Sequence, residues 1–227
     1  MFKRGDIVWG VCFALLLSVF LIPTTREPIL ALTARMPYTV GFVEFAILAS
    51  MGDILGARIV SGEYHLDSSV LWNAIVWGII GWAVTLVYPI YLGGAKLAQE
   101  QGYLPFTGIK LAQAFFGSAV MDLTFTPALN IFHRISAIWI DTFKEDSTEK
   151  VTLTSLVERT DWVTLIITTT LKVAIFMWIP VHTITFMFPQ IAQVAISAFT
   201  SILLGVVLSA TGRKTEDQST QSSEKIK

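Results

Sequence analysis

The stretch LWNAIVWGIIGWAVTLVYPIYL, residues 71–92, contains no charged side chain. A helix crosses the hydrocarbon core of a bilayer with roughly 20 predominantly apolar residues, and this stretch is long enough to do so. Apolar and polar residues do not alternate along it, and it is longer than a strand of a membrane barrel. The stretch therefore predicts a transmembrane helix.

Five further segments have the same character, residues 7–23, 38–59, 109–132, 162–188 and 191–208. The chain of 227 residues is 53% hydrophobic and 15% charged, so it carries far less charge than a soluble domain. We therefore expect an all-α integral membrane protein, a helical bundle of about six transmembrane segments. Lys172 and Pro180 interrupt the fifth segment, so we expect that helix to be kinked or broken.

The polar parts of the sequence divide the chain further. Residues 1–28 start with a short basic stretch and an apolar run, which predicts an N-terminal membrane anchor. No clear cleavage site follows the run, and a cleaved signal segment is the alternative. Residues 29–210 are predicted to form the membrane bundle, with a hydrophilic loop at 141–161. Residues 211–227 are polar and are predicted to be a disordered tail.

The charged residues predict an orientation and exclude one class of partner. The net charge is −1 and the basic residues form no block, so nucleic acid is not an expected partner. If the N-terminus is cytoplasmic, most basic loop residues fall on that side, and only Arg26, Arg35, Lys96 and Lys110 fall on the other. Both termini are therefore predicted to face the cytoplasm or the matrix of an organelle.

Three carboxylates, Glu44, Asp53 and Asp122, lie within the apolar segments. A charge at membrane depth is costly unless it is paired or hydrated, and such residues face the interior of a bundle or a water-filled cavity. Glu44 and Asp53 are nine residues apart, which places them on nearly opposite sides of one helix. We therefore expect that they do not line the same narrow pore.

Asp53 and Arg58 are close in sequence, but five residues is not an ideal spacing for a pair on one helix. One interpretation places both at a helix end, with Arg58 extending to the lipid headgroups. The other gives Asp53 a partner on a different segment, for which Lys172, Lys110 and His182 are the candidates. In both interpretations Arg58 lies near the membrane surface.

Further polar candidates lie beside prolines. Pro127 follows Asp122, which is typical either of a kink with a capped break or of a polar constriction beside a cavity. The stretch WIPVHTITFMFP, residues 178–189, holds a histidine that either hydrogen-bonds across helices or titrates as a proton carrier. The candidate polar residues of the interior or pore are Asp53, Asp122, His182, Thr185 and Glu44.

Small residues and prolines predict helix contacts and kinks. Gly52 and Gly56 form a small-xxx-small pair. We expect close packing or kinks at Gly52, Gly56, Gly81, Pro127, Pro180 and Pro189. The chain contains no common catalytic motif, and its single cysteine, Cys12, cannot form a disulfide or a zinc site within the chain. We therefore expect neither an enzyme nor a metal site.

Several residues occur in the order found in one known family. Pro37 and Thr39 precede the Gly52-Asp53 pair, Gly81 precedes Tyr88, Asp122 precedes Pro127, and the stretch at residues 178–189 follows. In this order the chain resembles the Mpv-seventeen family, also called the family of the peroxisomal membrane protein of 22 kDa. His182 and Thr185 stand where that family has glutamine and asparagine. The resemblance implies a small protein of a mitochondrial, peroxisomal or bacterial inner membrane, without a cofactor.

Three functions are open on the sequence alone. The resemblance and the buried polar residues favour a channel or permeability pathway for small solutes. An exporter of a small, amino-acid-like solute would need a titratable group such as Glu44 or Asp122. A non-transporting scaffold subunit would bind a partner through its charged loop and tail. The expected partners are the lipid bilayer and a small solute, and assembly into a homo-oligomer is left open.

Overall fold

The computed structural model describes residues 3–144 and 151–202. These residues are helical and contain no strand, which confirms the predicted all-α class. The helices are α1 (Arg4–Leu21), α2 (Pro23–Arg35), α3 (Pro37–Ser61), α4 (Ser68–Glu100), α5 (Lys110–Lys144), α6 (Leu153–Glu158), η1 (Thr164–Lys172), η2 (Ala174–Trp178), α7 (Ile179–Phe186) and a last described helix, Gln190–Ile202. The predicted disordered tail at 211–227 lies outside the described residues.

Five helical stretches are long and apolar enough to span a membrane. They are Arg4–Leu21, Pro37–Ser61, Ser68–Glu100, Lys110–Thr142 and Thr164–Phe186. The sixth predicted segment corresponds to the shorter apolar helix Gln190–Ile202, and the rest of that segment lies outside the described residues. The protein is therefore a membrane-embedded helical bundle.

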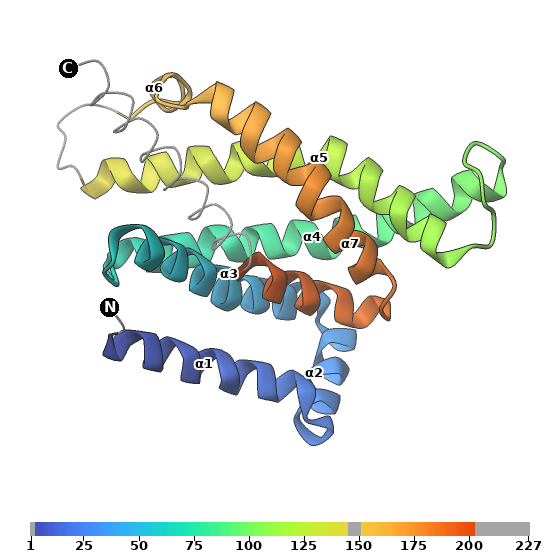
Figure 1. Ribbon diagram of the computed structural model, residues 1–227, viewed down its shortest axis with the longest axis horizontal. Helices are drawn as coiled ribbons and strands as arrows, with labels where there is room; N and C mark the ends of the chain where they lie inside the picture. The colour runs from blue at the N-terminus through green and yellow to red at the C-terminus, as the bar shows by residue number, and fades with distance from the viewer. Residues whose placement is uncertain (1–2, 145–150, 203–227) are drawn as a thin grey trace, which may run out of the picture.

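The long helices run back and forth along one direction (Figure 1). α2 lies across the end of α1 and the start of α3, and α6 lies at the opposite end, where α1 begins. The last described helix runs back toward this same end. This path follows from the sequence, because each apolar segment is separated from the next by a polar or proline-containing turn.

Local chemistry sets the ends of several helices. Pro23 and Pro37 occupy the first turns of α2 and α3, where a missing N–H group is tolerated. α3 ends at Gly62, whose φ of 76° suits glycine. α4 starts after Asp67, whose carboxylate accepts a hydrogen bond of 2.9 Å from the backbone N–H of Ser69.

The fifth segment departs from α-helical geometry. η1 and η2 are π-helical, and α geometry returns in α7, with Pro180 in its first turn. π turns are rare and occur mostly as single turns, frequently at functional sites. The irregularity predicted for this segment therefore takes the form of wide turns within a helix that continues to Phe186.

Glycines mark the closest helix contacts. A Cβ atom on Gly81 of α4 would lie 2.9 Å from both the carbonyl carbon of Gly41 and the Cβ of Phe45 on α3. A Cβ atom on Gly52 would lie 3.0 Å from the Cα of Ile202 on the last described helix. Gly81 therefore excludes larger side chains, whereas Gly52 is a tight contact, and the buried residue Gly56 follows one turn after Gly52.

α1 has no buried residue but is tied to the bundle by a polar cluster. The Nε and Nη2 atoms of Arg58 donate to the two carboxylate oxygens of Asp6, each at 3.0 Å. Asp6 also accepts from the hydroxyl of Tyr64 at 2.9 Å, and Lys3 pairs with Glu63. Arg58 therefore joins α3 to α1, and its contact with lipid headgroups stays a prediction.

Candidate functional site

The described helices surround a cavity of about 420 Å³. This volume falls within the range of small-molecule sites, roughly 300–1,000 Å³. Its walls come from α3, α4, α5, the fifth segment and the last described helix. Helices that are far apart in the sequence, from α3 to the last described helix, therefore line one cavity.

The cavity runs from exposed to buried residues. Arg134, Asp161 and Thr164 line one end and are exposed. Tyr88 and Met121 line the other end and are each 2% exposed. Asp161 follows α6, so the exposed end lies where α1 begins (Figure 1). The residues that line the cavity are therefore exposed at one end of the bundle and buried toward the other.

A row of polar residues on α5 follows the cavity. Ser118, Asp122, Thr126, Asn130 and Arg134 are spaced by four residues, which places each about one turn after the one before. The row covers about 24 Å of helix at a rise of 1.5 Å per residue. α5 therefore carries polar side chains from the exposed end of the cavity to beyond its buried end.

Asp122 and His182 form a buried pair at the inner end. The Nδ1 atom of His182 lies 3.0 Å from one carboxylate oxygen of Asp122 and 3.1 Å from the other. Ser118 and Thr126 donate their hydroxyls to the same carboxylate, at 3.1 and 3.0 Å. Asp122 is fully buried. α5 and α7 thus combine four polar side chains, and the contact between Asp122 and His182 joins residues that are 60 apart along the chain.

The hydrogen bonds of Asp122 assign a tautomer to His182. An ionised carboxylate only accepts hydrogen bonds, so we assign the proton of the neutral imidazole to Nδ1, where it donates to Asp122. His182 lines the cavity, and its Nε2 atom is then an acceptor. His182 can therefore accept a hydrogen bond from a solute in the cavity.

Aromatic rings close the inner end around His182. Trp178 stacks on the imidazole with ring centroids 5.0 Å apart and an interplanar angle of 10°. Phe186 stacks on its other side at 6.3 Å, and Tyr88 meets the imidazole edge-on at 5.7 Å. The hydroxyl of Tyr88 is also hydrogen-bonded to Ser197. These contacts hold the imidazole in one orientation.

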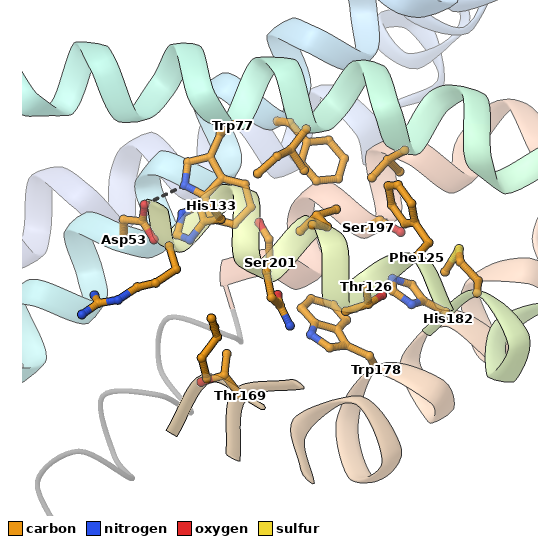
Figure 2. Close-up of a pocket in the computed structure, with 18 of the residues that line it drawn as sticks. Asp53, Trp77, Phe125, Thr126, His133, Thr169, Trp178, His182, Ser197 and Ser201 are labelled. Carbon is orange, nitrogen blue, oxygen red and sulfur yellow. Dashed lines mark hydrogen bonds between the residues drawn. The ribbon is translucent and has the colours of Figure 1, made fainter. Parts of the chain in front are cut away.

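A second cluster surrounds Asp53, away from His182 in the cavity (Figure 2). The indole N–H of Trp77 donates to Asp53 Oδ2 at 2.6 Å. The Trp77 ring also packs against the His133 imidazole, with centroids 4.5 Å apart. Ser197 and Ser201 on the last described helix lie between the two clusters (Figure 2). The cavity is therefore polar at two separated places.

The partners predicted for Asp53 are wrong. His182 binds Asp122, and the Lys110 ammonium donates to the backbone carbonyl of Met187 at 2.7 Å. Lys172 is exposed. Instead, the indole N–H of Trp77 on α4 supplies the hydrogen bond to Asp53.

Charges of both signs stand at the exposed end. Asp161 precedes the fifth segment, and the backbone N–H of Thr164 donates to its carboxylate at 3.1 Å. Hydrogen bonds from Thr164 lower the pKa of Asp161, and the positive charge of Arg134 contributes in the same direction. Asp161 and Arg134 therefore compensate each other in part at the cavity entrance.

The other predicted polar residues lie away from the cavity. Glu44 is 8% exposed and is not among the lining residues, and its Oε2 atom has no hydrogen-bond partner among the described residues. Thr185 is buried and donates back to the carbonyl of Val181 at 2.9 Å. Asp53 and His182 line the cavity, and Asp122 stands behind His182. Asp53 thus lines the cavity and Glu44 does not.

Sequence reasoning missed His133, Trp77 and Asn130 as lining residues. The four-residue spacing of polar residues along α5 was the available signal for Asn130. In the part of the chain that the structure describes, no group of three or more His, Cys, Asp or Glu side chains could hold a metal ion.

No known protein family, no curated protein and no solved structure matches this chain with significant similarity.

Proposed function

We propose that the protein is a permeability pathway for small solutes across a membrane, and that the cavity is part of this pathway. The observation that carries the proposal is the cavity of about 420 Å³, lined by polar side chains from several helices and accessible from one end of a membrane bundle. The order of residues that resembles the Mpv-seventeen family supports the same class of function. The proposal includes neither an enzymatic reaction nor a cofactor.

The cost of burying polar groups supports a pathway over a passive bundle. Polar and ionisable side chains inside a membrane are expensive, and those that persist mark solute or ion routes. Asp122 uses three neighbouring side chains to satisfy its carboxylate, and one of them, His182, also lines the cavity. Asp53 and Asn130 add polar groups directly to the cavity wall.

Flux through proteoliposomes tests the proposal. Purified protein is reconstituted, and the release of neutral, cationic and anionic solutes of increasing size is compared with that from empty liposomes. Asn130→Trp places a bulky ring in the cavity, whereas Leu123→Trp places the same ring on a side chain of α5 that is 50% exposed.

We expect flux of at least one class of small solute, reduced by Asn130→Trp and retained by Leu123→Trp. Both variants must elute as folded protein and give the wild-type helical circular dichroism spectrum. Absence of flux for the whole panel, or equal flux in both tryptophan variants, contradicts the proposal. Stable co-purification of another protein together with absent flux would support the scaffold alternative.

A proton-coupled transporter is the second candidate, favoured by the Asp122–His182 pair at the closed end of the cavity. A titratable pair between an open and a closed region is the arrangement that couples a proton to a change of access. Asp122→Asn should then abolish uptake driven by a proton gradient while solute exchange without a gradient continues. Uptake that is indifferent to the gradient in the wild type favours the passive pathway.

The proposed orientation places the exposed end of the cavity on the cytoplasmic or matrix side. α1 begins at this end of the bundle (Figure 1). Lys3, Arg4 and Arg159 are at or near the same end, in agreement with the excess of basic residues on the inner side of membrane proteins. The membrane is proposed to be a bacterial inner membrane or an organellar one.

A further inference from the structure

Formal charges are unevenly distributed along the cavity. Arg134 and Asp161 stand together at the exposed end, where the positive charge of Arg134 acts on Asp161. Asp53 is the third charged residue of the lining, and the histidines are taken as neutral. Among the residues that the structure describes, the lining contains no other Asp or Arg and no Glu or Lys. With these three groups ionised, the lining has one more negative than positive charge.

The direct hydrogen-bond partner of Asp53 is neutral. The Trp77 indole donates to Oδ2, and an indole N–H carries no formal charge. A carboxylate offers about four acceptor positions, so one donor leaves capacity for others. His133 lies against the Trp77 ring and is the titratable group that can supply a positive charge from the protein. When His133 is neutral, Asp53 can be neutralised by a proton or by a cation in the cavity, and only the cation also uses the aromatic wall.

Aromatic side chains line the same space. Trp77, Trp178, Phe125 and Tyr88 belong to the wall of the cavity, and the first three are seen around it in Figure 2. Faces of aromatic rings attract cations, and tryptophan does so most strongly. The rings also offer apolar surface, which a hydrated inorganic ion does not use.

We infer that the cavity binds a small organic cation with an apolar body, a quaternary or protonated amine, with Asp53 as its counter-ion and Trp77 and Trp178 as aromatic contacts. The inference rests on the proposed function, because it names the class of solute for the same cavity. Apolar residues such as Ile80, Val84 and Leu129 complete the wall and suit the body of such a molecule. The volume of about 420 Å³ accommodates one small molecule of this kind.

Calorimetric titration of the full-length protein in detergent tests the inference without requiring flux. Three benzyl compounds serve as probes: benzyltrimethylammonium, N-benzylacetamide and phenylacetate, which carry a positive, a neutral and a negative head group. The first two have the same number of non-hydrogen atoms. The titrations are done at about pH 8, where an ordinary imidazole is neutral.

We expect benzyltrimethylammonium to bind at least about tenfold more tightly than N-benzylacetamide, and phenylacetate to bind most weakly. Asp53→Asn should weaken binding of benzyltrimethylammonium about tenfold and so remove the preference for the cation, while binding of N-benzylacetamide is unchanged. The asparagine side-chain oxygen can still accept from Trp77, so the local fold is retained. Asp141→Asn is the matched control, because Asp141 is an exposed carboxylate of α5 that is not among the lining residues.

Trp178→Leu provides a second variant, which should weaken binding of the cation severalfold and leave Asp53 in place. Equal binding of all three probes, tighter binding of phenylacetate, or an unchanged cation preference in Asp53→Asn overturns the inference. Absence of binding by every probe overturns it as well. Binding of the cation without flux would sustain the inference and refute the permeability pathway, whereas flux of neutral solutes without cation binding would do the reverse.

Discussion

Replacing Gly81 by alanine should separate α3 from α4. The new Cβ atom would lie 2.9 Å from the Gly41 carbonyl carbon and from the Phe45 Cβ, closer than such contacts occur in proteins. One neighbour is a backbone atom and the other a Cβ atom, and neither can move by rotation of a side chain. The two helices must therefore shift apart, and Phe45 and Ile80 at the wall of the cavity must shift with them.

The free-energy cost can be separated from helix propensity with a matched control. Overpacking by one methyl group costs about 1–3 kcal/mol. Alanine also favours the helix over glycine by about 1 kcal/mol, which offsets part of that cost. Gly94→Ala lies on the same helix and would meet no atom within 4 Å, so it retains the propensity gain alone. The difference between the two variants should therefore be about 1–3 kcal/mol.

Thermal unfolding in detergent, followed by circular dichroism, measures this difference. A chain of this size shifts by about 2–4 °C for each kcal/mol, so Gly81→Ala should unfold about 2–12 °C below Gly94→Ala. Gly94→Ala itself should unfold at or slightly above the wild-type temperature. If Gly81→Ala unfolds at the same temperature as Gly94→Ala or higher, the close approach of α3 and α4 at this residue is refuted.

Three further perturbations follow from the structure. Phe186→Ala removes a 1% exposed ring beside His182, which should lower the free energy of unfolding by about 3–5 kcal/mol and increase solute leak through proteoliposomes. The control Phe188→Ala, at a 47% exposed side chain, should change neither measurement greatly. Unchanged leak in a folded Phe186→Ala protein would argue against closure of the cavity by this ring. Arg58→Gln removes the ion pair to Asp6 and should increase hydrogen–deuterium exchange in α1, with Arg26→Gln as the exposed control. Equal exchange in the two variants would exclude this contact between α1 and α3. Hydrogen bonds from Thr164 lower the pKa of Asp161, so the ionised carboxylate stabilises the fold above the ordinary carboxyl pKa of about 3.9, and this stabilisation is lost as the pH falls through the lowered pKa. Between about pH 5 and about pH 2, the thermal midpoint of Asp161→Asn should therefore fall less than that of the wild type. Parallel curves of midpoint against pH would contradict this.

The helices could be predicted from the sequence because their physical cause is local. Each long helix contains an apolar stretch of membrane-spanning length, and proline, glycine or a capping aspartate stands at several of the ends. The π turns could not be predicted, because Lys172 and Pro180 indicate only that the fifth segment is irregular. Wide turns and a sharp break are both compatible with that pattern.

The candidate site could be predicted in its parts but not in its pairings. Asp122 and His182 stood out as polar residues in apolar segments, but their contact joins residues 60 apart, which depends on how α5 packs against α7. The predicted fourth segment ended at residue 132, whereas α5 continues to Lys144, so His133 and Arg134 fell outside the predicted segment. The pairing of Arg58 with Asp6 joins residues 52 apart and depends in the same way on how α1 packs.

Modification of a single cysteine in the cavity tests the permeability pathway most directly. Cys12 is the only native cysteine and is exposed on α1, so Cys12→Ala gives a background without thiols. In that background, Asn130→Cys places a thiol in the cavity wall, and Leu123→Cys places one on a side chain of α5 that is 50% exposed. A charged, membrane-impermeant thiol reagent is then added to one side of the proteoliposomes at a time, and both labelling and solute flux are measured. The account predicts that Asn130→Cys is labelled from the side on which α1 begins and that labelling stops flux, while Leu123→Cys keeps its flux. Flux that continues after complete labelling of Asn130→Cys, or an Asn130→Cys thiol that reacts from neither side, would contradict it.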